Sequence, residues 1–229
     1  EPIGKKGGST IARPLEITEP SPLRRKPPCP LADRCGGCDW LHLSYQAQCD
    51  AKREILEDCL TRIGRLKEFP KIEIVAADEF AYRHRAQLKI SAEGATGFFA
   101  RNSNDVVSVA SCPLLVLSLN ALLEDFAAAR TAAPPGPASL MLFAGDGAAV
   151  ASSPLIHGVT RASVALRVAG QTFEVRADGF FQSNRPLLER FGAWSRQLVQ
   201  GDLCVDLYGG SGFFSLMLAG RFKQGLLVE

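Results

Sequence analysis

The C-terminal stretch constrains the fold most, because strand-like and helix-like segments alternate there around a glycine-rich turn. We expect DLCVDLY (202–208) to form a short buried strand, YGGSG (208–212) a turn, FFSLMLAGRF (213–222) a helix and GLLVE (225–229) a second strand. This order is the beginning of a doubly wound α/β domain, in which helices connect neighbouring parallel strands.

The glycine turn is the first candidate binding site. Gly210 and Gly212 allow a sharp turn close to a ligand, and the N-terminus of the following helix offers free N–H groups. A phosphate-binding loop would place a lysine at the helix start, and none is present; nor is the first glycine of a dinucleotide fingerprint in register. The order Asp206-x-Tyr208-x-Gly210-x-Gly212 instead resembles motif I of class I S-adenosylmethionine methyltransferases, although glycine turns after strands are common.

Glu229 ends the second strand, at the edge of the sheet where ligands bind in such domains. A carboxylate there can accept both hydroxyls of a ribose. By itself it would be read as an acid at a strand end beside solvent, but together with the glycine turn ribose binding is the better interpretation.

Three cysteines are clustered near the N-terminus, in PPCPLADRCGGCDW (27–40), with the spacing Cys29-x5-Cys35-x2-Cys38. Thiolates in this density suit zinc, with His42 as a fourth ligand, and equally suit an iron–sulfur cluster with a distant fourth cysteine. Three unliganded core thiols are the alternative. The spacing does not choose between the metals.

Composition limits the remaining possibilities. The 229 residues are 46% hydrophobic, which is enough for a sizeable core, and the formal net charge is only +2. No apolar run is long enough to span a membrane or to act as a signal peptide, so we expect a cytoplasmic protein. Seven unevenly placed cysteines do not form the framework of a small secreted domain. Short basic runs such as YRHRAQLK (82–89) suit phosphates but are more often solvated surface.

Elsewhere the patterns predict one helical segment and then a β-rich region. Apolar spacing of three and four predicts a helix over 44–63, on which Cys49 and Cys59 are expected to be small core residues. A helix is also predicted over 114–129, with a loop at TAAPPGPAS (131–139), and another over 186–199 with Asn184 as candidate cap. The predicted strands are KIEIVAA (71–77), RAQLKISA (85–92), TGFFAR (96–101), DVVSVAS (105–111), SLMLFAG (139–145), AAVASS (148–153), ASVALRVAG (162–170) and QTFEVRA (171–177).

Five blocks in this order closely resemble the uracil-5 RNA methyltransferase family. They are PPCPLADRCGGCDWLHLSYQAQCDAKREI, YRHRAQLKI, GFFARNSNDVVSVASCPLL, DGFFQSNRPLLERF and VDLYGGSGFFSLMLA, and they cover essentially residues 18–229. The family makes 5-methyluridine in ribosomal or transfer RNA. The resemblance implies the end of an N-terminal RNA-binding β-barrel at 1–28, a cysteine segment with a helix at 29–66, a β-rich central domain at 67–178 and the beginning of the methyltransferase domain at 179–229.

The resemblance also implies the site residues. In the cluster-containing branch the matching cysteines hold a four-iron, four-sulfur cluster, which carries over to Cys29, Cys35, Cys38 and Cys112, and which favours ribosomal RNA over transfer RNA as the substrate. The implied contacts of S-adenosylmethionine fall on the residues of the FFQSN block and of motif I, namely Gln182, Asp206, Tyr208, Gly210, Gly212, Phe213 and Glu229. Arg83, Arg85 and Lys89 become candidate RNA phosphate contacts.

Two departures from the family pattern matter. Gly209 stands where the family usually has cysteine, a change that we expect to preserve the turn. The family's nucleophilic cysteine and its base lie downstream of the ribose acid, so we expect a truncated, monomeric chain that is inactive by itself, with Cys204 buried and inert in its strand. We also expect the incomplete C-terminal sheet to leave apolar faces uncovered.

Two other functions remain open. A non-catalytic RNA-binding module built on a zinc knuckle needs no missing residues, but it does not explain why Gln182, Gly210, Gly212 and Glu229 occur together. The other is a transfer-RNA uridine methyltransferase. It remains open because the choice of target RNA depends on RNA shape and loop contacts.

Overall fold

The computed structural model describes residues 1–128 and 138–229 and, of Lys6, only the backbone. The chain divides into two compact units. Unit 1 comprises residues 1–27 and 40–72, and unit 2 comprises residues 28–39 and 73–229. The predicted loop 131–139 lies mostly outside the described residues, as does the last residue of the predicted helix 114–129.

Unit 1 contains a hairpin and a helix. Strands β1 (Pro2–Lys6) and β2 (Ser9–Ala12) pair antiparallel, and α1 (Tyr45–Asp58) continues into one π-helical turn (Cys59–Ile63). Ser44 begins α1, because its hydroxyl accepts the Ala47 N–H at 3.3 Å. The predicted helix is therefore confirmed.

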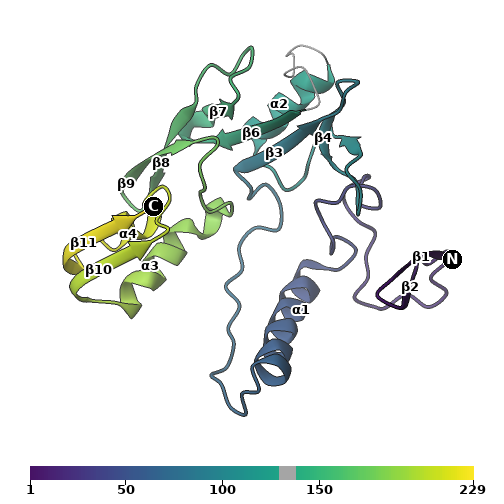
Figure 1. Cartoon of the computed structure of the whole chain (residues 1–229), viewed down its shortest axis with the longest axis horizontal. Coiled ribbons are helices and arrows are strands. Elements are labelled where there is room, and N and C mark those ends of the chain that lie inside the picture. The colour runs from purple at the N-terminus through teal and green to yellow at the C-terminus, as the bar shows by residue number, and fades with distance from the viewer. Residues whose placement is uncertain (129–137) are drawn as a thin grey trace. The chain divides into compact units, whose positions relative to one another are not determined.

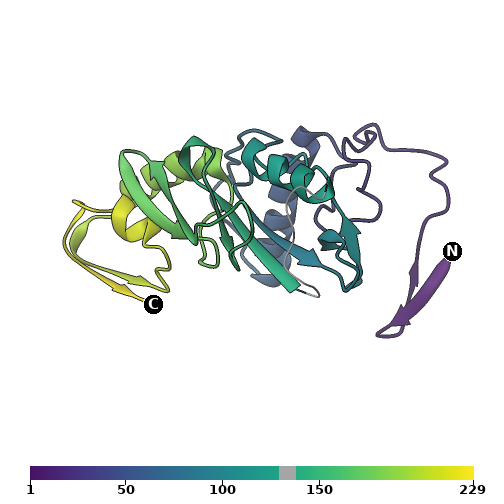
Figure 2. The ribbon, with the colours of Figure 1, turned by 90° about the horizontal axis from the view of Figure 1, so that it is seen from above.

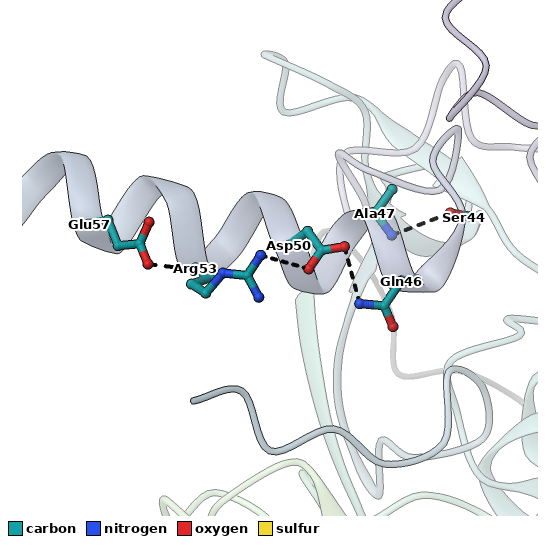
Figure 3. A network of polar contacts seen from close by, with 6 residues as sticks. All are labelled: Ser44, Gln46, Ala47, Asp50, Arg53 and Glu57. Atoms are coloured by element: carbon teal, nitrogen blue, oxygen red, sulfur yellow. Dashed lines mark hydrogen bonds and ion pairs between the residues drawn. The ribbon is translucent and has the colours of Figure 1, made fainter. Parts of the chain in front are cut away.

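One surface of α1 carries a chain of polar contacts (Figure 3). Gln46 donates to Asp50 at 3.1 Å, and Arg53 pairs with Asp50 at 3.0 Å and with Glu57 at 4.0 Å. Such exposed pairs at helical spacing add only a few tenths of a kcal/mol each, ~0.3–0.5. Cys49 is buried as expected, but Cys59 is only partly buried, so its expected core position is wrong.

Unit 2 is built on a five-stranded antiparallel sheet with the order β5-β4-β3-β6-β7. The strands are β3 (Arg85–Ile90), β4 (Thr96–Phe99), β5 (Val106–Ser108), β6 (Ala138–Ala144) and β7 (Val150–Ser153). Helix α2 (Leu117–Ala127) lies along one face (Figure 1), where its leucines pack against alternate residues of β3 and β6. The predicted strand 71–77 is wrong: no strand forms there, and Ile74 and Val75 are exposed because no neighbouring strand pairs with this segment.

A second hydrophobic core joins this sheet to the C-terminal part of unit 2. Strands β8 (Ser163–Val168) and β9 (Gln171–Arg176) form a hairpin, and a short 3-10 turn (Arg185–Leu187) leads into α3 (Leu188–Leu198). Phe143, Phe173, Phe181 and Phe213 meet in this core with ring centroids 5.4–5.8 Å apart. Asn184 stands at the expected cap position, but its side chain makes no capping hydrogen bond, so that expectation is wrong.

The C-terminal stretch has the predicted order of strand, turn, helix and strand. Strands β10 (Gly201–Leu207) and β11 (Phe222–Val228) are parallel, and α4 (Phe213–Met217) connects them; Figure 2 shows these three elements at the C-terminal end of the chain. Helix α4 is shorter than predicted, because the chain reverses at Gly220 with a φ of 79°.

The apolar faces of this short sheet are uncovered, as expected. Leu203, Leu207 and Leu226 are each more than half exposed. The strand 202–208 is therefore not buried, and Cys204 within it is only partly buried, which corrects both predictions. Within the described residues, no helix combines the length and the apolar composition that a bilayer crossing needs.

Candidate functional site

The glycine turn connects the end of β10 to α4 through left-handed backbone conformations. Tyr208, Gly210 and Gly212 have φ values of 57°, 55° and 73°. A non-glycine residue rarely adopts such a φ, so the backbone of Tyr208 is strained, and its side chain is 93% exposed. The turn therefore presents an exposed aromatic ring beside the start of a helix.

Glu229 lies on this turn. Its Oε2 accepts a hydrogen bond from the Gly210 N–H at 2.6 Å, and the residue itself is exposed. The acid at the end of the second strand and the glycine turn after the first strand thus meet at the carboxyl edge of the parallel pair, as the sequence predicts.

Asp206 stabilises the same turn through two hydrogen bonds with Ser215. Its Oδ2 accepts the Ser215 backbone N–H at 3.1 Å and the Ser215 hydroxyl at 2.7 Å. Ser215 lies in the first turn of α4, so the carboxylate satisfies a free donor and complements the positive end of the helix. The structure gives Asp206 a role in fixing the turn.

Phe213 and Gly209 are both closely packed against other residues. The Phe213 ring is buried in the aromatic core, which leaves its backbone N–H, at the first residue of α4, as the group that can face a cofactor. A Cβ added at Gly209 would come within 2.7 Å of the Leu227 side chain. A cysteine at position 209 would therefore require Leu227, which is 42% exposed, to move.

The segment that carries Gln182 lies beside the turn. The Ser211 hydroxyl donates to the Phe180 carbonyl at 3.0 Å, and the rings of Phe181 and Phe213 are 5.8 Å apart. The FFQSN block and motif I, which are separated by more than twenty residues of sequence, are thus neighbours in unit 2.

His84 is a residue of this site that the sequence analysis missed. Its Nε2 lies 2.6 Å from the Gln182 carbonyl oxygen, and the ring is fully buried against Phe143 and Phe181. Burial lowers the pKa of His84 to about 4; the hydrogen bond to Gln182 opposes this shift and the charge of Arg185 adds to it. The ring is therefore neutral near pH 7 and donates its Nε2–H to the carbonyl. No local pattern marks this histidine, because its partner is 98 residues away.

The four predicted cluster cysteines all lie in unit 2 and are free and partly buried. Burial first, and then the charges of Cys112, Cys35 and Cys29, together raise the pKa of Cys38 to about 11, while the charge of Arg83 opposes them. Cys112 also has a raised pKa, chiefly through burial. The other three thiols are therefore near enough to Cys38 to interact with it electrostatically.

The four thiols are not arranged as a metal-coordination shell in the described residues. In the part of the chain that the structure describes, no group of three or more His, Cys, Asp or Glu side chains is arranged to hold a metal ion. The backbone around them is nevertheless well anchored: Gly37 N–H points to the Cys35 sulfur at 3.4 Å, and Asn120 bonds both the N–H and the carbonyl of Cys112. His42 belongs to unit 1, where its carbonyl accepts the Arg25 N–H at 2.7 Å.

The three predicted RNA contacts are not equivalent. Arg83 acts electrostatically on Cys38 and Cys112, so its cation lies near the thiols. Arg85 is partly buried, with its Nε enclosed and unpartnered among the described residues, and burial lowers its pKa. Lys89 lies on the sheet surface, where Nζ donates to the Ser139 hydroxyl at 2.8 Å.

The comparisons with known proteins support the family resemblance. No family profile matches the chain. It is 30% identical to an uncharacterized RNA methyltransferase of Aquifex aeolicus, over 99% of this chain and 62% of that protein. It is 32% identical to a 23S rRNA (uracil(1939)-C(5))-methyltransferase of Dichelobacter nodosus, over 93% of this chain and 59% of that protein.

A solved structure agrees at the level of fold. The Pyrococcus abyssi tRNA (uracil-54, C5)-methyltransferase, determined with S-adenosyl-L-homocysteine, superposes with a TM-score of 0.71 at 19% identity and covers 96% of this chain and 63% of that one. The chain therefore has a mixed α/β fold and is similar to RNA methyltransferases. One of these relatives is named as a uracil-5 enzyme, and the chain spans about three fifths of the length of the relatives it matches.

Proposed function

We propose that the protein methylates carbon 5 of uridine in RNA, with S-adenosylmethionine as the methyl donor. One observation carries the proposal: the Gln182 segment, the glycine turn and the Glu229 carboxylate meet at the carboxyl edge of β10 and β11. This edge is where doubly wound sheets bind nucleotide-type ligands.

Each group in this site has a distinct binding task. The Glu229 carboxylate suits the two ribose hydroxyls, and Gly210 and Gly212 leave room for the ligand beside the backbone. Gln182 offers an amide that both donates and accepts, from a backbone that His84 fixes at 2.6 Å. Tyr208 presents an exposed aromatic face at the rim.

The chemistry at uracil needs two further groups. Carbon 5 of uracil is a poor nucleophile, so we infer that a cysteine thiolate of the whole protein adds to carbon 6 and makes carbon 5 reactive toward the methyl group. A carboxylate base then removes the carbon 5 proton, and the thiolate is eliminated. The family resemblance places both groups after the ribose acid in sequence, so neither is assigned to a residue of this chain.

We further propose that Cys29, Cys35, Cys38 and Cys112 hold a four-iron, four-sulfur cluster. Four reduced thiols, three of which act electrostatically on the fourth, Cys38, are the donor set that such a cluster requires. Iron ligation would offset the burial and the neighbouring charges that raise the pKa of Cys38. The cluster would connect the segment 28–39 to the turn that precedes α2.

Ribosomal RNA is the proposed substrate, because the Dichelobacter nodosus relative is named for 23S rRNA. Transfer RNA is the second candidate, because the Pyrococcus abyssi enzyme acts on it. We propose a cytoplasmic monomer, as expected from clustered thiols in a reducing compartment.

A methyl-transfer assay on the full-length protein tests the function. Unmodified 23S ribosomal RNA and transfer RNA would each be incubated with methyl-labelled S-adenosylmethionine, digested to nucleosides and separated. We expect label in 5-methyluridine from ribosomal RNA. Label in another nucleoside, or transfer to neither RNA, would refute the proposal.

A further inference from the structure

One face of the five-stranded sheet in unit 2 is only partly covered. Alternate residues of β3 and β6 pack under α2 on the other face, where Leu88, Leu140 and Leu142 are fully buried. On the open face, the β8–β9 hairpin covers only the end around Phe143 and Ala151. At the opposite end of this face, Gln87, Phe99 and Ser139 are exposed among the described residues of unit 2.

The pairing register places polar and aromatic side chains together on the open end. Lys89 pairs with Gly97 on one side and with Ser139 on the other, and Gln87 pairs with Met141. Phe99 lies two residues after Gly97 and therefore on the same face. Gln87, Ser139 and Phe99 are all exposed.

Lys89 and Phe99 are in direct contact. The Lys89 Nζ lies 5.0 Å from the centre of the Phe99 ring, a cation–π distance, and is also held by Ser139. The ring is 37% exposed. A flat aromatic surface and a cation are thus fixed side by side on an antiparallel sheet.

A hollow of about 430 Å³ adjoins this pair, within the ~300–1,000 Å³ usual for small-ligand sites. Its floor includes Gln87, Lys89 and Phe99, and its wall is the cysteine loop at Gly36 and Gly37. The wall is fixed to the sheet, because Gly36 N–H donates to the Phe99 carbonyl at 2.9 Å.

Arg101 also fixes the cysteine loop that forms this wall. Its Nη2 donates to the Cys38 carbonyl at 2.7 Å, and its Nη1 pairs with Asp39. Because this pair neutralises both charges, Lys89 supplies the net positive charge of the hollow. A second hollow is also lined by Lys89 and Phe99 but contains Glu93 and Asp105, so phosphate is favoured in the hollow beside the cysteine loop.

We propose that this open end of the sheet binds an unstacked nucleotide of single-stranded RNA. The base stacks on Phe99, the Gln87 amide contacts its edge, and Lys89 contacts the phosphate. Open antiparallel sheets with exposed aromatic side chains suit this task, because every base has a face that can stack and single strands expose it. The proposal rests on RNA as the substrate and names the surface that would hold a nucleotide outside the methylation site.

Fluorescence anisotropy with a short labelled oligouridylate tests the site, using the 229-residue chain and its variants. Phe99→Leu keeps an apolar side chain but removes the ring, and we expect at least about 5-fold weaker binding, from the ~1 kcal/mol lower limit of base–aromatic stacking. Lys89→Gln should lower the slope of log affinity against log salt by about 0.7, the value for one phosphate of a single strand.

Two matched variants serve as controls. Trp194→Leu removes an exposed aromatic ring from α3, and Lys223→Gln removes an exposed cation from β11. Both should leave RNA affinity and salt slope unchanged. Equal affinities for the wild type and Phe99→Leu would overturn the proposal, as would equal losses in Phe99→Leu and Trp194→Leu.

The outcomes also separate this proposal from the proposed function. If the full-length protein transfers methyl groups to uridine but Phe99→Leu binds RNA normally, the sheet site fails while the function stands. If RNA binding depends on Phe99 but the full-length protein transfers no methyl group, the function fails while the site stands. If Phe99→Leu instead changes the sedimentation of the chain, the face is an interface between copies, and the RNA site is refuted.

Discussion

His84 should make the stability of unit 2 depend on pH in a way that one substitution removes. The folded ring is buried, neutral and bonded to the Gln182 carbonyl, whereas the unfolded ring can take up a proton freely. Its pKa is about 4 in the folded chain against an ordinary value of 6.5. His84→Gln keeps an N–H donor and cannot titrate.

The sign and the size follow from these two pKa values. Between pH 6.5 and pH 4 the unfolded chain binds more protons at this residue than the folded chain, so the free energy of unfolding rises with pH in this window. The contribution is complete above about pH 6.5 and is lost as the pH falls toward 4. A shift of about 2.5 units corresponds to about 3 kcal/mol, to order of magnitude.

Urea unfolding at a series of pH values measures this contribution. The chain has two tryptophans, so Trp40→Phe leaves Trp194 in α3 as a fluorescence probe of unit 2. The stability advantage of the parent over His84→Gln should shrink by about 3 kcal/mol between pH 7 and pH 4. Carboxylates that titrate in the same range cancel in this difference.

His157 supplies the control, because it is exposed and makes none of these contacts. The His157→Gln variant should keep the loss of stability between pH 7 and pH 4 that His84 causes in the parent. A parallel pH dependence of the parent and His84→Gln would refute the reasoning, because it would show that His84 is not buried in its neutral form.

Three more predictions concern the site. Glu229→Gln should weaken S-adenosylhomocysteine binding about 10-fold by calorimetry, since hydrogen bonds to a charged group contribute ~1.5 kcal/mol or more; unchanged affinity would remove the ribose assignment. Cys112→Ser should lose iron from protein purified without oxygen, whereas Cys49→Ser, at a buried position in α1, should keep it; equal iron content would contradict the ligand set. Asp206→Ala removes both bonds to Ser215 and should lower the free energy of unfolding by ~1–2 kcal/mol in urea titrations, while an effect below the measurement error would show that it does not fix the turn.

The sequence predicted those features that depend on local pattern. The alternation in β3, β6, β8 and β9 and the glycine turn before α4 are encoded within a few residues, and the structure has all of them. The expected strand 71–77 failed for the opposite reason: its alternation is genuine, but a strand also needs a partner, which no local pattern supplies.

Contacts between residues far apart in sequence could not be predicted from local sequence patterns. The contact of His84 with Gln182 and the juxtaposition of Lys89 with Phe99 follow from strand register and from how the two segments of unit 2 pack. The expected burial of β10 was wrong because, in the described part of unit 2, helices do not cover both faces of the short sheet and its apolar side chains stay exposed. The cysteines were found by spacing, whereas the role of Arg101 in anchoring their loop was not.

The most direct test of the account is to locate where S-adenosylhomocysteine binds, by hydrogen exchange with and without the ligand. The account predicts slower amide exchange in two segments that are far apart in sequence, around Gln182 and from Tyr208 to Gly212, with little change in α1 or α2. Protection confined to other segments, or no protection at saturating ligand, would contradict the claim that these residues form the cofactor site.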